Sequence, residues 1–249
     1  MSLDAQVLRG ADLSDRLQRR PVAQSAVVFK GMVWDVRRDI VDLGEAGEVT
    51  REYVEHPGAV SIVALRQVGD RDQVLLIQQY RHPVGAFEWE LPAGLLDVAG
   101  EPPWQGAARE LHEEADLAAG RWHVLIDYFS SPGGISEALR IFLARDLTGV
   151  PQGARFSREG EEHAMPVCWV DLDEAHDAVL RGQLHNPSAV VGILTAHAAR
   201  ARGWVTLRPH NALWPQHPAY RCPTQGGLSG QPMSWRSRTD RFEGTTARP

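Results

Sequence analysis

Three glutamates within five residues are the most chemically suggestive feature of the sequence. Glu110, Glu113 and Glu114 lie in the segment ARELHEEADL at spacings of i, i+3 and i+4, so on a helix they project from one side. Carboxylates this close repel each other unless a cation neutralises them. Mg²⁺ and Mn²⁺ prefer oxygen ligands and bind phosphate groups alongside carboxylates. The spacing therefore predicts a divalent-cation site that could hold a phosphorylated substrate.

Taken alone, the run RELHEE also fits an acidic helix face exposed to water, and this structural alternative stays open. Neighbouring positions favour the cation site. Arg109 lies four residues before Glu113 and eight after Glu101, so it could hold either carboxylate through a bidentate pair. The preceding loop begins at Gly94, after an apolar strand. A strand, a loop and an acidic helix in this order are the elements that such a site needs.

Several elements must position these carboxylates. No proline interrupts residues 104–116, and Ala107, Ala108, Leu111 and Ala115 recur on one helical face, so we expect a helix there. Residues 26–57 are strand-like around the turn GEAGE, which predicts a small antiparallel sheet. Further strands are expected in GAVSIVAL, QVLLIQQYRH, WELPAG, WHVLIDYFSS, EALRIFLARDL and AMPVCWVDL, and further helices in DEAHDAVLRGQL and from Pro187 to about Arg202, with Asn186 as the N-cap.

Composition limits the classes of function. The formal net charge of −6 and the lack of a basic stripe argue against nucleic-acid binding. No apolar run is long enough to cross a membrane, and the start of the chain does not resemble a signal peptide, so we expect a cytoplasmic protein. Residues 1–57 are expected to form an N-terminal β region and 58–207 the main domain. The Pro/Gly/Arg-rich tail, 208–249, is expected to be largely flexible, at least after Cys222. Trp214 and Trp235 leave partial docking of the tail on the body open.

The acidic segment resembles the Nudix box. Glu101, Arg109, Glu110, Leu111, Glu113, Glu114 and Leu117 match that pattern in register. There are two departures: Gly94 precedes Glu101 by one residue more than the pattern has, and Asp116 replaces the closing glycine. Glycine there would supply a left-handed turn, a conformation that Asp also tolerates. The resemblance implies an α/β (α+β) fold, a Nudix-type α/β/α sandwich with a mixed β-sheet, plus a small N-terminal antiparallel β domain.

The resemblance also implies roles for the residues of the box. Glu110 and Glu114 would be the principal ligands of Mg²⁺ or Mn²⁺, and Glu113 would assist them. The backbone carbonyl of Ala93 would add a ligand from the loop that contains Gly94. Arg109 would orient the carboxylates, with Glu101 as its partner.

Two further segments are similar to those of ADP-ribose pyrophosphatases within this family. SSPGGISEALR looks like their proline-containing loop, since Pro132 lies fifteen positions after Leu117. Glu137 would then act as general base or position the attacking water. The segment TREYVEHPGAV is similar to a stretch that binds adenine, which makes Arg51 and Glu52 candidates for substrate contacts. Two further candidates are Trp34, which could stack on the base, and Arg81, which could reach a phosphate or the base.

The implied activity is metal-dependent hydrolysis of ADP-ribose to AMP and ribose 5-phosphate. The implied assembly is a homodimer through the N-terminal β region. Two alternatives stay open. One is a Nudix hydrolase of another substrate: a sugar nucleotide, a dinucleoside polyphosphate or an oxidised nucleotide. The other is a module that binds ADP-ribose without cutting it.

Overall fold

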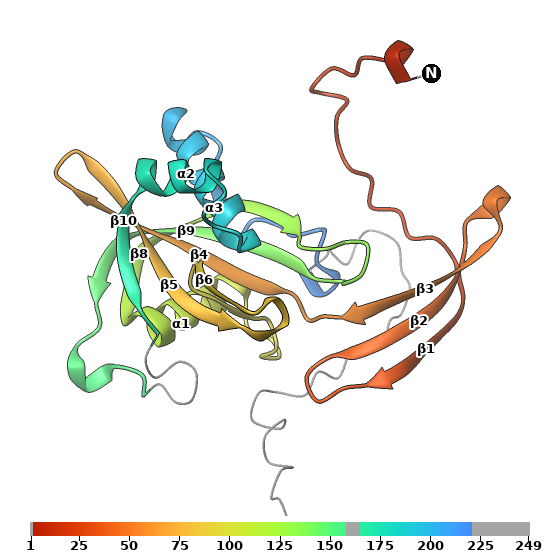
Figure 1. Ribbon diagram of the computed structural model, residues 1–249, viewed down its shortest axis with the longest axis horizontal. Helices are drawn as coiled ribbons and strands as arrows, with labels where there is room; N and C mark the ends of the chain where they lie inside the picture. The colour runs from red at the N-terminus through yellow and green to blue at the C-terminus, as the bar shows by residue number, and fades with distance from the viewer. Residues whose placement is uncertain (1, 158–164, 221–249) are drawn as a thin grey trace, which may run out of the picture.

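The computed structural model describes residues 2–157 and 165–220, which form two β-sheets and three α-helices (Figure 1). The strands are β1 (Val22–Lys30), β2 (Asp35–Asp42), β3 (Glu48–Glu55), β4 (Ala59–Val68), β5 (Arg71–Arg81), β6 (Ala86–Glu90), β7 (Ala93–Leu95), β8 (Leu117–Phe129), β9 (Ala138–Gly149), β10 (Val167–Asp171) and β11 (Arg208–Pro209). The helices are α1 (Pro103–Ala115), α2 (Leu172–Leu180) and α3 (Pro187–Ala201). Within the described residues, none of these helices is long and apolar enough to span a membrane.

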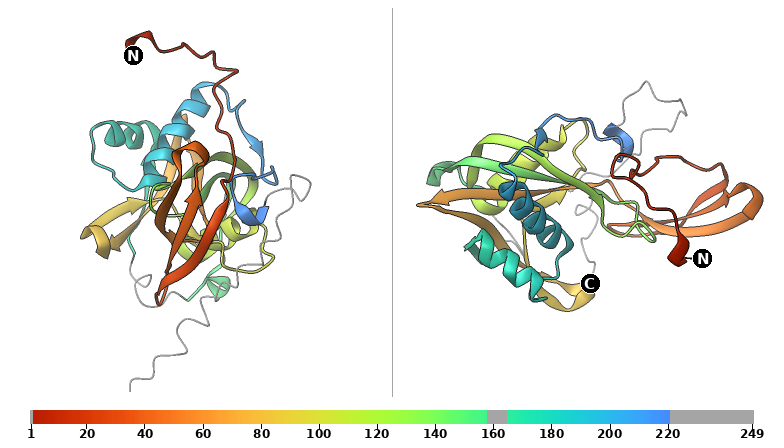
Figure 2. Two further views of the ribbon diagram at one scale, coloured as in Figure 1. Left: turned by 90° about the vertical axis from the view of Figure 1, so that its right-hand side faces the viewer. Right: turned by 90° about the horizontal axis from the view of Figure 1, so that it is seen from above.

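The N-terminal strands form a sheet of their own, in the antiparallel order β1-β2-β3. The turn GEAGE connects β2 to β3, as its composition predicts, and forms a short 3₁₀ turn at Gly44–Ala46. Every residue of β1 is exposed. This sheet stands beside the main body in Figure 1 and in the right-hand view of Figure 2. The expected small antiparallel sheet is therefore confirmed.

The main sheet has the order β10-β5-β4-β9-β8-β11, with β6 paired to β5 and β7 paired to β4. Strands β4 and β9 run parallel, whereas the other pairs are antiparallel. A mixed sheet with central strands buried on both faces must be covered on both sides.

Alternate residues of β4 show how both faces are covered. On one face, Val63 packs with Leu172 of α2 and Ile193 of α3. On the other face, Ile62 packs with Leu111 of α1. Because successive side chains of a strand point to opposite faces, one apolar strand serves both layers. The structure therefore confirms the α/β/α sandwich.

The helix ends follow from their capping residues. Asp116 ends α1 in the left-handed conformation (φ 53°, ψ 37°), and its backbone N–H bonds to the carbonyls of Leu111 and His112. Asp thus replaces glycine at this turn, as the sequence predicts. At the start of α3, the side chain of Asn186 accepts a hydrogen bond from the N–H of Ala189, which confirms the expected N-cap.

Part of the C-terminal segment packs on the body. Residues 208–220 pack on the body, and Trp214 is only 1% exposed. The buried guanidinium of Arg140 lies 4.6 Å from the Trp214 ring and donates to the carbonyls of Ala212 and Leu213. These contacts hold the part of the tail around Trp214 against the body. Residues 221–249 lie outside the described residues.

Candidate active site

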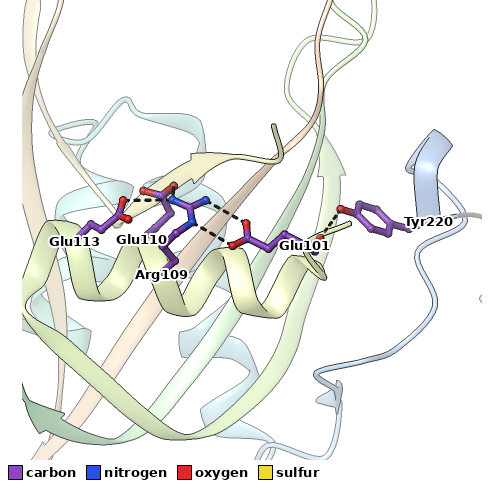
Figure 3. Close-up of polar contacts among 5 residues, drawn as sticks. All are labelled: Glu101, Arg109, Glu110, Glu113 and Tyr220. Carbon is purple, nitrogen blue, oxygen red and sulfur yellow. Dashed lines mark hydrogen bonds and ion pairs between the residues drawn. The ribbon is translucent and has the colours of Figure 1, made fainter. Parts of the chain in front are cut away.

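The guanidinium of Arg109 lies among three carboxylates on and before α1 (Figure 3). Its Nε and Nη2 each lie 3.2 Å from an oxygen of Glu101. Its Nη1 donates to Glu110 at 2.6 Å and to Glu113 at 3.3 Å. Burial lowers the pKa of Arg109, but the hydrogen bonds to Glu101 and the charge of Glu110 raise it above its ordinary value. Arg109 therefore stays charged and holds these carboxylates in one cluster.

The C-terminal segment reaches the same cluster from outside. The Tyr220 hydroxyl donates to the backbone carbonyl of Glu101 at 3.0 Å, as Figure 3 shows. Burial raises the pKa of Tyr220, so the hydroxyl keeps the proton that it donates. Glu101 is thus held at two points: Arg109 binds its side chain, and Tyr220 binds its main-chain carbonyl.

The acidic side of α1 is not a water-exposed face. Glu110 and Glu114 are only 5% and 8% exposed. Burying carboxylates is unfavourable unless hydrogen bonds or opposite charges compensate. An acidic run that served only solubility would lie in solvent, so this burial argues against the structural alternative left open by the sequence.

The strand β7 packs directly against these carboxylates. The N–H of Ala93 donates to Glu114 Oε2 at 2.9 Å. A Cβ atom at Gly94 would overlap the carboxyl group of Glu110. Glycine at this position therefore allows the main chain to approach the helix closely. This contact brings the loop backbone and two of the expected ligands together.

The donor set fits a hard divalent cation. In the part of the chain that the structure describes, no three His, Cys, Asp or Glu side chains form a ready-made cation site. A closed cage is not required, because Mg²⁺ usually keeps several waters and binds through one or two carboxylates plus substrate phosphates. The buried oxygens of Glu110 and Glu114 beside Gly94 meet that requirement.

Glu137 lies at the end of the loop after β8, directly before β9. In β4, Ala59 pairs with Leu95 of β7 on one side and with Leu139 of β9 on the other. The loop glutamate and the strand that packs on α1 therefore flank the same end of β4. Function often concentrates in loops held at strand ends in this way.

The side chain of Glu137 contacts a histidine that the sequence interpretation does not include. Its Oε1 lies 3.4 Å from Nε2 of His56, and the two side chains are 17% and 4% exposed. The ring of Trp34, expected to stack on a substrate base, stacks on His56 at a centroid distance of 4.4 Å. One face of Trp34 is therefore occupied within the chain itself.

Arg51 and Glu52, on β3, line a hollow of about 380 Å³ beside the proline-containing loop. The other residues that line it are Tyr53, Pro132, Gly133, Ile135 and Ser136. Glu52 also pairs with Arg38 of β2. The structure thus brings two expected substrate contacts next to the loop that ends at Glu137.

Arg81 is held by an internal ion pair. Its Nε and Nη2 donate to the two oxygens of Glu90 at 2.7 and 2.6 Å. Hydrogen bonding to Glu90 raises the pKa of Arg81, and the negative charge of Glu114 adds to the effect. Of the α1 carboxylates, Glu114 is therefore the one whose charge acts on Arg81.

Three contacts of the site lie outside the sequence interpretation: those made by His56, Glu90 and Tyr220. None of these three residues belongs to a periodic pattern or a metal-binding spacing. Only His56 could have been suspected from the sequence, because it lies in TREYVEHPGAV, the segment already singled out for substrate contacts. Glu90 and Tyr220 are recognised only once the fold places them beside Arg81 and Glu101.

Comparison with known proteins agrees with this geometry. Residues 55–190 match the NUDIX domain family. The chain is 43% identical to the ADP-ribose pyrophosphatase of Mycobacterium tuberculosis, over 78% of this chain and 90% of that protein. It is 29% identical to the ADP-ribose pyrophosphatase of Bacillus subtilis, over 71% of this chain and 91% of that protein. A crystal structure of an ADP compounds hydrolase has the same fold, with a TM-score of 0.61 and 23% identity over 77% of this chain and 100% of that one.

The family match covers more than half of the chain, and the 43% identity extends over most of it. Both findings agree with the buried acidic helix α1 and with β7, the strand whose Gly94 packs against it. The chain belongs to the Nudix family.

Proposed function

We propose that this Nudix enzyme hydrolyses the pyrophosphate bond of ADP-ribose, giving AMP and ribose 5-phosphate. The observation that carries the proposal is the cluster of α1 carboxylates packed against Gly94. The proposal is also supported by the similarity of most of this chain to two proteins named ADP-ribose pyrophosphatase. A diphosphate bridged by a divalent cation is the substrate chemistry that such a cluster suits.

Glu110 and Glu114 would hold Mg²⁺ or Mn²⁺, with help from Glu113 and the carbonyl of Ala93. The bound cation would neutralise phosphate charge and acidify a water molecule. Arg109 would keep the carboxylates oriented, because its guanidinium already contacts Glu110 and Glu113.

Glu137 would act as the general base of the reaction. It accepts a proton from the attacking water, whose oxygen forms a bond to one phosphorus while the bridging P–O bond breaks. Glu137 precedes β9, which pairs with the same end of β4 as β7, the strand that packs on the α1 carboxylates. This placement supports the role, because a general base must first lie within reach of the proton that it removes. Arg81 would face the phosphates, where its charge favours the developing negative charge.

The adenosine part of the substrate would occupy the hollow between β3 and the proline-containing loop. Arg51 and Glu52 line that hollow and offer a donor and an acceptor for the edge of the base. Trp34 can present to a base only the ring face that His56 leaves uncovered. These contacts would select the nucleoside, whereas the α1 carboxylates would serve any diphosphate.

A homodimer through the N-terminal sheet is the assembly that we propose. Val27, Val28 and Phe29 of β1 are exposed, and among residues 2–157 and 165–220 no strand pairs with the outer edge of β1. Uncovered apolar edge strands favour association. Sedimentation equilibrium should give twice the chain mass of 27.5 kDa, and Phe29→Asp should shift the protein towards monomer. A wild-type protein that stays monomeric at micromolar concentration would contradict this assembly.

The proposed activity is tested by product identification. Purified protein incubated with ADP-ribose and Mg²⁺ should release AMP and ribose 5-phosphate in equal amounts, and a chelator should stop the reaction. A parallel panel would contain a sugar nucleotide, a dinucleoside polyphosphate and an oxidised nucleoside triphosphate. If one of these compounds were cleaved faster than ADP-ribose, that compound would be the preferred substrate, and ADP-ribose would not. Tight binding of ADP-ribose without release of AMP would identify a binding module instead.

A further inference from the structure

We propose that His56 is a positioning residue for Glu137, the general base of the proposed function on which this inference rests. The motivating observation is the 3.4 Å approach of His56 Nε2 to Glu137 Oε1, made by two side chains that are largely shielded from solvent. The two residues come from different parts of the chain: the connection that leaves the N-terminal sheet and the loop before β9.

The hydrogen bonds of His56 determine which ring nitrogen carries its proton. The backbone N–H of Gly58 donates to His56 Nδ1 at 3.0 Å. A ring nitrogen that accepts a hydrogen bond carries no proton, so in the neutral ring the proton is on Nε2. That atom is the one nearest Glu137. The separation is long for a hydrogen bond, but such contacts in ligand-free sites often shorten when substrate binds.

The ring of His56 is itself fixed in place. Trp34 stacks on it with an angle of 26° between the ring planes. The backbone N–H of His56 donates to Ser136 Oγ at 2.9 Å, directly beside Glu137. The main chain of Val54 exchanges hydrogen bonds with the same loop, at Gly134 and Ser136. The end of β3 and the proline-containing loop therefore form one connected unit.

The C-terminal segment also contacts this unit, through His217. His217 Nε2 lies 2.7 Å from the carbonyl oxygen of Pro57. The approach requires glycine at the next position: Gly58 has a φ of +89°, and a Cβ there would overlap the His217 ring. His56 thus sits on a main chain that has little freedom to move.

A fixed donor on one oxygen of a carboxylate has a specific consequence for catalysis. It limits rotation of the Glu137 side chain and leaves Oε2 to accept the proton of water. In many enzymes a neighbouring side chain orients the catalytic base in this way. The contact between His56 and Glu137 is an approach of 3.4 Å in this structure. If it shortens to a hydrogen bond when substrate binds, its removal is expected to lower kcat about tenfold, with KM little changed.

Two substitutions separate positioning from a purely structural role. In His56→Asn, the shorter amide can still accept from the Gly58 N–H, as Nδ1 does, but cannot reach Glu137. In His56→Gln, the longer amide places an N–H where Nε2 lies. If His56 positions Glu137, His56→Asn should lower kcat about tenfold, and His56→Gln should keep most of the wild-type kcat. A purely structural role predicts the opposite order, with activity following the melting temperature. The exposed His185, changed to Asn, is the matched control and should keep wild-type activity.

A double-mutant cycle decides the question. Glu137→Gln alone should lower kcat about a hundredfold, as expected for loss of a general base. Adding His56→Asn to that variant should change kcat by less than about twofold, because the partner of His56 has already lost its function. Losses that multiply would overturn the positioning role while leaving the proposed activity intact. Full activity of Glu137→Gln would overturn both the base assignment and this inference, and an inactive wild type would overturn the proposed function itself.

Discussion

A Glu114→Gln variant is expected to lose about a hundredfold or more of its turnover while keeping its fold, which corresponds to at least about 2.7 kcal/mol of transition-state stabilisation. Glutamine has the same size as glutamate, and its carbonyl oxygen can still accept the hydrogen bond from the Ala93 N–H. What it lacks is the negative charge that binds a divalent cation. Turnover is therefore expected to fall although the packing of α1 is retained.

The measurement is kcat for ADP-ribose at saturating Mg²⁺, together with the melting temperature without metal. Glu174→Gln, which changes an exposed glutamate of α2, is the matched control and should behave like wild type. Normal turnover by purified Glu114→Gln would refute its assignment as a ligand. A large fall in melting temperature without metal would instead indicate that the side chain is needed for folding.

Gly94→Ala is expected to have an effect of the same size, about a hundredfold or more in turnover. The added Cβ would overlap the carboxyl group of Glu110. Because that group is the end of a flexible side chain, the side chain can move aside, and the main chain need not shift. The fold should survive, but Glu110 would be displaced from the position in which it binds the cation.

This prediction is checked by comparing melting temperatures with and without millimolar Mn²⁺, and by measuring turnover. Wild type should gain stability from the cation by mass action, whereas Gly94→Ala should gain little. Gly153→Ala is the control, since a Cβ there meets no atom within 4 Å. Full activity and normal metal stabilisation in Gly94→Ala would contradict the close-approach role of this glycine.

The acidic helix could be predicted because it has local signals, whereas the α/β/α sandwich is implied by the resemblance of this segment to the Nudix box. The i, i+3, i+4 spacing of the α1 glutamates and the apolar face that includes Leu111 appear in the sequence itself. The structure places Leu111 in the core and ends the helix at Asp116, in the left-handed turn that aspartate tolerates. Short-range patterns of this kind fix an element before its tertiary partners are known.

The contacts between distant segments could not be predicted in this way. His56 and Ser136 are 80 residues apart, and Pro57 and His217 are 160 residues apart. The composition of residues 208–249 favours flexibility and leaves partial docking open, but it does not reveal that Trp214 is buried beside Arg140. Such contacts depend on which strands become neighbours, and that information is not contained in any short window of sequence.

The central claim, that the α1 carboxylates bind a divalent cation, is tested most directly by calorimetric titration of the folded protein with Mn²⁺. The titration is run with and without a nucleoside diphosphate. Wild type should show saturable heat of binding that becomes tighter with the nucleotide, and a Glu110→Gln, Glu114→Gln double variant should show little or none. Absence of any cation uptake by folded wild-type protein, even with the nucleotide present, would contradict the claim.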